Sequence, residues 1–261
     1  MNKDNNKIEE LINSGSEIVG AATGGVIGFF AGGPVGAAFG GAGGVIVAKG
    51  LSKLGREVKQ RLLGKREEIR IGATISYAII RIQEKLSSGC SLRDDSFFNN
   101  EINNRSVADE IYEGVILSAQ REHEEKKLLY YGNLLANIAF NKEIDRSFAN
   151  QLIQLSDSLS YRQLCLLDIF FRSSKTKSVI LRESNYRSVK IAKELIPVIY
   201  EILGLYNRNL IVDPKVHVFG LTDVNPAGLD VHGLGILLYD MMELSTIPNE
   251  DVSPIVYLLQ Q

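Results

Sequence analysis

Residues 18–48 read IVGAATGGVIGFFAGGPVGAAFGGAGGVIVA, and this uncharged stretch decides how the chain is interpreted. Glycine costs a water-exposed helix roughly 1 kcal/mol per residue relative to alanine, so a regular glycine series needs a compensating interaction. Small residues at four-residue spacing let helix backbones touch in lipid. The stretch therefore predicts a glycine zipper that packs helices in a membrane or in a self-associating assembly. Its helix-packing positions are Gly20, Gly24, Gly28, Gly32, Gly36, Gly40 and Gly44.

The stretch has an internal bend signal at Gly33 and Pro34. Proline removes a backbone donor and clashes with the preceding turn, so we expect a hinge there and a hairpin of two helices, about Glu17–Ala31 and Val35–Ala48. Each arm would measure about 22 Å, less than the ~30 Å hydrocarbon core of a bilayer. Such arms would enter one leaflet, thin the bilayer or span it only as an assembly. A single crossing by the whole stretch is the alternative, because about 20 residues suffice for one span.

A basic cluster follows the stretch directly. Such clusters mark the cytoplasmic side of a membrane and attract anionic head groups. The flank before the stretch carries a weaker basic signal, Lys3 and Lys7, so a hairpin with both ends inside fits better than one crossing. The residues expected to contact lipid head groups are Lys49, Lys53, Arg56, Lys59 and Arg61.

Composition excludes several classes of protein. With 29 basic and 31 acidic residues, the chain lacks the strong positive charge of most nucleic-acid-binding domains. Two distant cysteines, Cys90 and Cys165, form no disulfide framework or metal knuckle. The apolar run is longer than the apolar region of a secretion signal, which argues against a cleaved signal peptide. A phosphate-binding loop is also disfavoured, because no G-K-[ST] follows the glycines.

The middle of the chain predicts a helical body. A linker is expected near residues 88–105, where Asn, Asp and Ser are abundant. Ser106 and Asp109 then have the spacing of a capping box and begin a long helix through about Phe140. The other expected helices are Leu51–Ser87, Asp145–Leu159 and Tyr161–Arg172.

No catalytic, cofactor or metal site emerges from the motifs. Residues 120–127, QREHEEKK, pair opposite charges at helical spacing and predict a solvated face, and His123 and Glu124 do not complete an H-E-x-x-H motif. Asp94, Asp95 and Glu101 lack the spacing of a calcium loop. The remaining candidates have ordinary structural interpretations: Cys165 as a core residue, and His217 and His232 as polar residues flanking a hairpin.

The last third of the chain has a different residue pattern from the helical body. Helix candidates Ser188–Leu203 and Val231–Leu244 flank a β-branched stretch, Leu210–Thr222, and a turn cluster. These elements, with a closing helix after GLDVHGLGILLYDMMEL, resemble a winged-helix module. A DNA-binding module needs a basic recognition helix, but this candidate offers only Lys190 and Lys193 against two glutamates. A protein-contact or sensing role is therefore expected, and DNA binding is disfavoured.

The expected fold is mainly α, in three parts. Residues 1–50 form the glycine-zipper helical hairpin, residues 51–175 the helical body, and residues 176–261 a small α+β winged-helix-like domain.

The passages GVILSAQREHEEKKLLYYGNLLANIAF and SLSYRQLCLL resemble a bacterial family of this layout that carries no named activity. The layout itself, a glycine zipper joined to a helical body and a winged-helix-like end, is similar to bacterial membrane effectors of the antiphage or abortive-infection type. The resemblance implies a non-enzymatic, self-assembling and pore-forming protein of the bacterial inner membrane. Its body would be cytoplasmic, and its partners would be the lipid bilayer, further copies of the chain and a protein contacting the C-terminal domain. Two alternatives stay open: a soluble homo-oligomeric scaffold, and a membrane-tethered winged-helix regulator.

Overall fold

The computed structural model describes residues 64–99 and 105–261. In these residues the fold is mainly helical, with eight α-helices and one two-stranded antiparallel sheet. The predicted mainly α class is therefore confirmed. The glycine series, its hinge and the basic cluster at 49–61 lie outside the described residues, so the hairpin stays a prediction.

The chain divides into two compact units between Asp157 and Ser158. The boundary predicted at residue 175 falls later, inside a helical turn of the second unit. Among the described helices, none has both the length and the apolar character that a membrane crossing requires.

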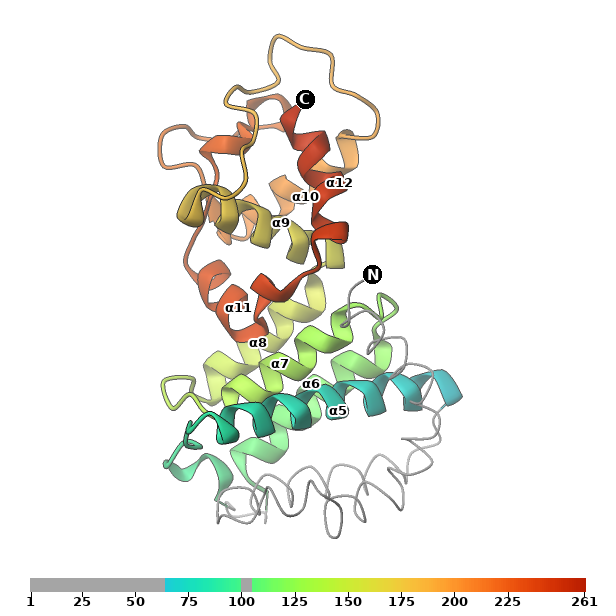
Figure 1. Ribbon diagram of the computed structural model, residues 1–261, viewed down its shortest axis with the longest axis vertical. Coiled ribbons are helices and arrows are strands. Elements are labelled where there is room, and N and C mark those ends of the chain that lie inside the picture. Colours follow the sequence, from blue (N-terminus) through green and yellow to red (C-terminus); the bar gives the residue numbers. More distant parts are fainter. Residues whose placement is uncertain (1–63, 100–104) are drawn as a thin grey trace. The chain divides into compact units, whose positions relative to one another are not determined.

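Unit 1 is a helical bundle in which α5 lies along α7 and α6 (Figure 1). The first turn of α6 is closed by the predicted capping box, because Ser106 Oγ accepts from the Asp109 amide at 3.1 Å and Asp109 Oδ2 accepts from the Ser106 amide at 2.9 Å. The elements are α5 (Lys65–Ser87), the 3-10 turn η1 (Ser96–Phe98), α6 (Val107–Arg121), α7 (Lys127–Ile138) and α8 (Arg146–Ser158).

Helix α7 approaches α5 closely at Gly132. A β-carbon there would lie 2.5 Å from Tyr77 Cβ and 3.0 Å from both the Ala78 nitrogen and the Thr74 oxygen. The two backbones therefore meet at this point, and any side chain at position 132 would separate them. Glycine is needed here for the close approach, within a core built mainly of aliphatic and tyrosine side chains.

The single long helix predicted from Ser106 to Phe140 is wrong. The chain leaves the helix after Arg121, because Glu122 is extended (φ −68°, ψ 121°), and α7 begins only at Lys127. The solvated face predicted for residues 120–127 is also wrong in part, since Glu122 and Lys127 are buried. The side chains of Glu122 and Lys127 form an ion pair across this break.

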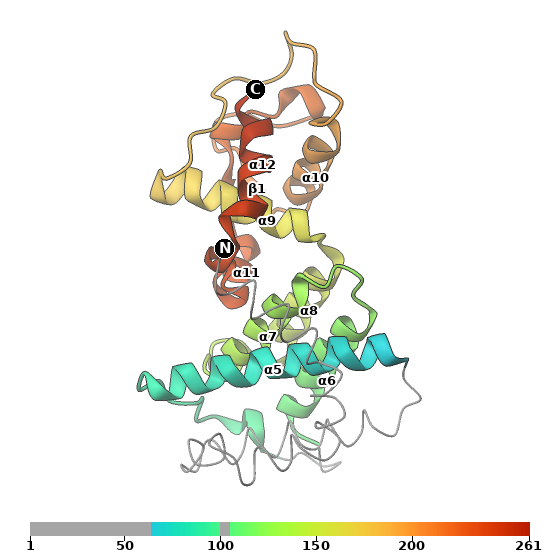
Figure 2. The same cartoon turned by 45° about the vertical axis from the view of Figure 1, so that its right-hand side comes forward.

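Unit 2 surrounds α9, which packs against α10, α11 and α12 (Figure 2). The sheet pairs Ile211 with Val231 and Val212 with Asp230. The helices are α9 (Tyr161–Phe171), the π-helical turn η2 (Arg172–Thr176), α10 (Ile196–Asn207), α11 (Leu234–Met242) and α12 (Asn249–Gln260). The remaining elements are β1 (Ile211–Val212), β2 (Asp230–Val231) and the 3-10 turns η3 (Leu221–Asp223), η4 (Pro226–Gly228) and η5 (Leu244–Thr246).

Three predictions for unit 2 differ from the structure in their bounds, and proline explains two of them. The helix expected at Val231–Leu244 spans only Leu234–Met242, because Val231 belongs to β2. The helix expected to start at Ser188 starts at Ile196, because Pro197 is favourable only in a first turn. The β-branched stretch from Leu210 forms only a two-residue strand, because Pro214 cannot donate to a ladder. The sheet and a closing helix are present, and the winged-helix assignment stays a prediction.

Candidate functional site

The helix α5 follows the predicted membrane segment along the chain, so the contacts that hold its first turns are the best candidate for a functional site. We name these contacts the connector latch. It comprises Arg66, Glu67 and Arg70 on α5, with Gln120 at the end of α6 and Glu125 in the turn before α7.

The latch consists of charge-assisted hydrogen bonds between these two segments. The Arg66 guanidinium donates to Glu125 Oε2, and Arg70 Nε donates to Glu125 Oε1 at 3.4 Å. Gln120 Nε2 donates to Glu67 Oε1 at 3.2 Å.

Glu67 also receives the Gly64 amide at 2.7 Å. The Gly64 amide and the Gln120 amide together lower the pKa of the Glu67 carboxyl from its ordinary value. The start of α5 is therefore fixed to the α6–α7 turn by polar contacts that are accessible to solvent and sensitive to salt.

A buried ion pair joins the two ends of the α6–α7 turn. The Lys127 ammonium contacts Glu122 Oε2 while the two side chains are only 2% and 5% exposed. The Tyr131 hydroxyl donates to Glu122 Oε2 at 3.1 Å, and the Glu124 amide donates to Glu122 Oε1 at 2.9 Å.

Burial opposes ionisation of Glu122, but the Lys127 ammonium and these hydrogen bonds hold the pKa of its carboxyl below its ordinary value. The Glu122 carboxylate therefore keeps its charge inside the α6–α7 turn, where Lys127, Tyr131 and the Glu124 amide all contact it.

The same turn contains the one metal-ligand group found among residues 64–99 and 105–261: Glu122, His123 and Glu124, with ligand atoms within 4.8 Å of one another. His123 Nδ1 lies 3.7 Å from Glu122 Oε1. Because Lys127 and Tyr131 already use the Glu122 carboxylate, the geometry favours an ion pair over a metal centre.

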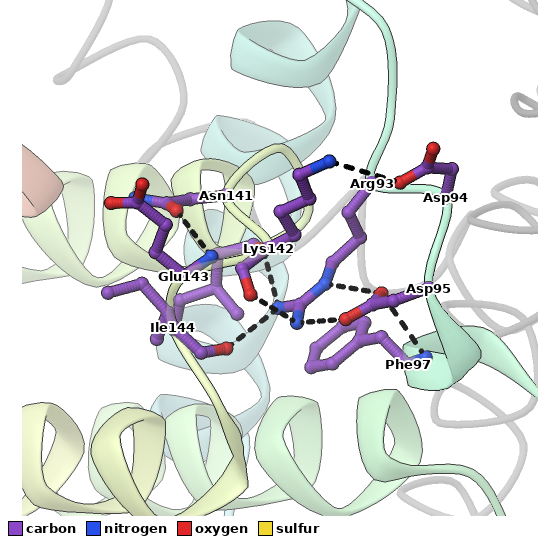
Figure 3. A network of polar contacts seen from close by, with 9 residues as sticks. Arg93, Asp94, Asp95, Phe97, Asn141, Lys142, Glu143 and Ile144 are labelled. Atoms are coloured by element: carbon purple, nitrogen blue, oxygen red, sulfur yellow. Dashed lines mark hydrogen bonds and ion pairs between the residues drawn. The ribbon is translucent and has the colours of Figure 1, made fainter.

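The predicted linker is anchored by a second buried cation, Arg93 (Figure 3). Its guanidinium makes a two-point contact with Asp95, at 2.8 and 2.6 Å, and donates to the carbonyl oxygen of Ile144 at 2.9 Å. The ring of Phe97 lies 4.1 Å from the guanidinium carbon. Arg93 therefore clamps the segment after α5 to the turn between α7 and α8, and Asp95 is engaged by this arginine.

The other predicted cation ligands are not assembled into a site. Asp94 lies 3.8 Å from Lys142 in an exposed ion pair, and Glu101 is outside the described residues.

Unit 2 contains a buried carboxylate where α9 passes into the π-helical turn. Asp168 is completely buried, with the Arg172 guanidinium 2.7 Å from Oδ2 and the Tyr239 hydroxyl 3.4 Å from Oδ1. Burial raises the pKa of Asp168 to about 6, although Arg172 and Tyr239 act in the opposite direction. Single π-helical turns are frequent at functional positions, so this group is a second candidate.

The structure separates the predicted residues into three outcomes. Cys165 is buried in the core, as predicted, and Cys90 is exposed. Lys190 and Lys193 are exposed and precede α10, so they do not lie on a helix that reads DNA. The zipper glycines, the hinge and the predicted lipid-contacting cations lie outside the described residues.

Sequence reasoning missed the connector latch and the three buried ionic groups around Glu122, Arg93 and Asp168. The pattern of charges in residues 120–127 resembles an exposed helix, and only the break at Glu122 separates the buried members from the exposed ones. One signal of the break was present in the sequence. Residues 120–127 lack the apolar stripe that a continuous amphipathic helix needs.

Comparison with protein-family models, with curated protein sequences and with solved structures found no match to this chain.

Proposed function

We propose that this chain is a membrane-associated, self-assembling protein in which residues 17–48 form the assembling element and the helical body controls it. The observation that carries the proposal is the glycine at every fourth position from Gly20 to Gly44 in a stretch without charge. Close helix packing in lipid offsets the helix penalty of those glycines. Pore formation at a bacterial inner membrane, in defence against phage, is the specific form of the proposal, and it involves no enzymatic step.

The connector latch supports a controlling role for the body. A force or displacement in the membrane segment reaches the body through α5, whose first turns are held by Arg66, Arg70 and Glu125. The pairs are partly solvent-exposed, so the network is expected to contribute about 1 kcal/mol. That energy changes the ratio of latched to released α5 about fivefold. A trigger therefore needs little energy to release the connector.

The zipper is tested with two triple variants of identical composition. In the first, Gly24, Gly40 and Gly44 become Leu; in the second, the neighbouring Gly25, Gly41 and Gly43 become Leu. Both add the same apolar volume, but only the first obstructs the predicted contact stripe. We expect the first to abolish oligomers and inner-membrane leakage on induced expression, and the second to retain both.

Membrane attachment is measured in the same cells by carbonate extraction. Recovery of the native chain in the carbonate supernatant, as a defined oligomer and without leakage, would favour the soluble-scaffold alternative. Equal behaviour of the two triple variants would refute the zipper.

The latch is tested by Glu125→Gln, with the exposed Glu143→Gln as control. Loss of the shared carboxylate is expected to raise leakage about fivefold at equal expression, whereas the control leaves it unchanged. Unchanged leakage in Glu125→Gln would refute control through α5, without bearing on the zipper.

A further inference from the structure

Unit 2 exposes an apolar loop that the proposed function does not explain. Residues 213–220, here named the tip loop, follow β1 and leave Phe219 82% and Val216 48% exposed. Phe219 is the most exposed large hydrophobic side chain in the described part of the chain. A single exposed apolar residue is ordinary. A functional role for Phe219 therefore requires that the tip loop hold it in a fixed, exposed position.

The first half of the loop is held by an aspartate that faces inward. Asp213 is buried, and its Oδ1 accepts hydrogen bonds from the amides of Lys215 at 2.9 Å and Val216 at 3.0 Å. The backbone of Gly228 passes close to the same carboxylate, since a β-carbon there would lie 2.7 Å from Asp213 Oδ2. The position of Val216 is thus set by contacts within unit 2.

The second half is held by two side chains from neighbouring elements. The Tyr206 hydroxyl of α10 accepts from the Val218 amide at 3.3 Å and contacts His217 Nδ1 at 2.8 Å. Asp223 Oδ2 accepts from the Phe219 amide at 3.1 Å, and the His217 ring lies 4.8 Å from the Phe219 ring. The loop is therefore organised before any partner binds, which reduces the ordering cost of an interaction.

The charge that the tip loop offers to solvent is positive. Lys215 is exposed, and no carboxylate in the described residues forms an ion pair with it. Arg208, at the end of α10, is also exposed and donates to the Gly204 carbonyl at 3.0 Å. The two nearby carboxylates are occupied, because Asp213 caps the loop amides and Asp223 pairs with Arg187 at 2.8 Å. An anionic partner matches this arrangement.

We propose that the tip loop is a second membrane contact, in which Phe219 and Val216 enter the interface of an anionic bilayer and Lys215 lies at the lipid phosphates. This inference rests on the proposed function, because a chain already held at the membrane by residues 17–48 presents the loop at high effective concentration. Exposed aromatic and aliphatic side chains next to basic residues are typical of interfacial anchoring. A bilayer accepts one aromatic and one aliphatic side chain without a complementary pocket, whereas a protein partner needs such a pocket.

The chain contains no tryptophan, which permits a clean site-specific probe. The full chain carrying Phe219→Trp is reconstituted into vesicles of phosphatidylcholine with or without phosphatidylglycerol, with bromine atoms on the acyl chains to quench tryptophan that enters the bilayer. The matched control is Tyr257→Trp, since Tyr257 of α12 is an aromatic residue of the same unit and is 66% exposed. Carbonate extraction of the same vesicles reports attachment through residues 17–48 independently.

We expect the fluorescence of the Phe219→Trp chain to be quenched at least twofold more than that of the Tyr257→Trp chain in anionic vesicles. Quenching should fall in neutral vesicles and when Lys215→Glu is added. Quenching that persists although carbonate releases the chain would support the tip loop and refute the proposed membrane segment.

Equal, weak quenching at both positions in a carbonate-resistant chain would overturn the tip-loop proposal alone. Protection of the Phe219→Trp fluorescence from acrylamide without quenching by the brominated lipids would also overturn it, in favour of a protein partner.

Discussion

Replacing Lys127 by methionine removes one partner of the buried ion pair in unit 1 while retaining an unbranched apolar stem. Lys127 and Glu122 are 2% and 5% exposed, so the carboxylate left behind has lost its counter-ion away from water. Breaking a buried pair in this way costs about 3–5 kcal/mol. The free energy of local opening around α7 should fall by that amount, which accelerates amide exchange between about a hundredfold and several thousandfold.

The stability lost in Lys127→Met should depend on pH, with a smaller loss at lower pH. In the native chain the Lys127 ammonium lowers the pKa of the Glu122 carboxyl; in Lys127→Met the pKa should rise, because burial is no longer opposed by that charge. Protonation then removes the unpaired charge, so the variant should be less destabilised near pH 5 than near pH 8. The double variant Glu122→Gln with Lys127→Met removes both charges and should recover most of the lost stability.

Hydrogen exchange of the full chain, read on peptides from α6 and α7, measures these effects. Lys142→Met serves as control, because Lys142 is 69% exposed in a 3.8 Å pair and its loss should change stability by less than about 0.5 kcal/mol. A Lys127→Met variant within 0.5 kcal/mol of the native chain would refute the reasoning. So would a double variant as unstable as the single one.

Three further predictions concern packing, ionisation and helix capping. Gly132→Ala should destabilise unit 1 by about 1–3 kcal/mol in urea unfolding, because its β-carbon would collide with Tyr77 at 2.5 Å; Gly114→Ala, which meets only the end of an isoleucine side chain at 3.3 Å, should be neutral or stabilising. The raised pKa of Asp168, about 6 against an ordinary 3.8, means that the native state retains a proton that the unfolded chain has lost. Stability from this group therefore falls by about 3 kcal/mol as pH rises from about 4 to 6; Asp168→Asn should lack that decrease, and parallel pH profiles for the two proteins would contradict the assignment. Ser106→Ala should cost about 1 kcal/mol and accelerate exchange in the first turn of α6; an unchanged rate there would show that the capping box contributes nothing.

Local signals predicted the elements whose formation depends on nearby residues. The capping box at Ser106 and Asp109, the body helices near α8 and α9, and the core position of Cys165 were all found where the sequence placed them. Each depends on a side-chain pattern within one or two turns of helix. Pro197 and Pro214 are also local signals, and they account for the start of α10 and the end of β1.

The connector latch and the Arg93 contacts were not predictable in the same way, because each joins segments distant in sequence. The Glu122–Lys127 and Asp168–Arg172 pairs are local, but their burial depends on the packing of other segments. Glu125 meets Arg66 and Arg70 from across the bundle. Arg93 meets the carbonyl of Ile144 far along the chain. A charged residue looks the same in a sequence whether it is solvated or buried against a partner.

The amino-acid sequence by itself determined the helical character of this protein and the glycine periodicity on which its proposed function depends, since both follow from short-range spacing of residue types. Tertiary structure decided which charges are buried, where the helix from Ser106 breaks, and how α5 is held. The physical reason is that an ionic side chain leaves water only when it has a partner in a low-dielectric surrounding, and that surrounding is supplied by distant segments of the fold.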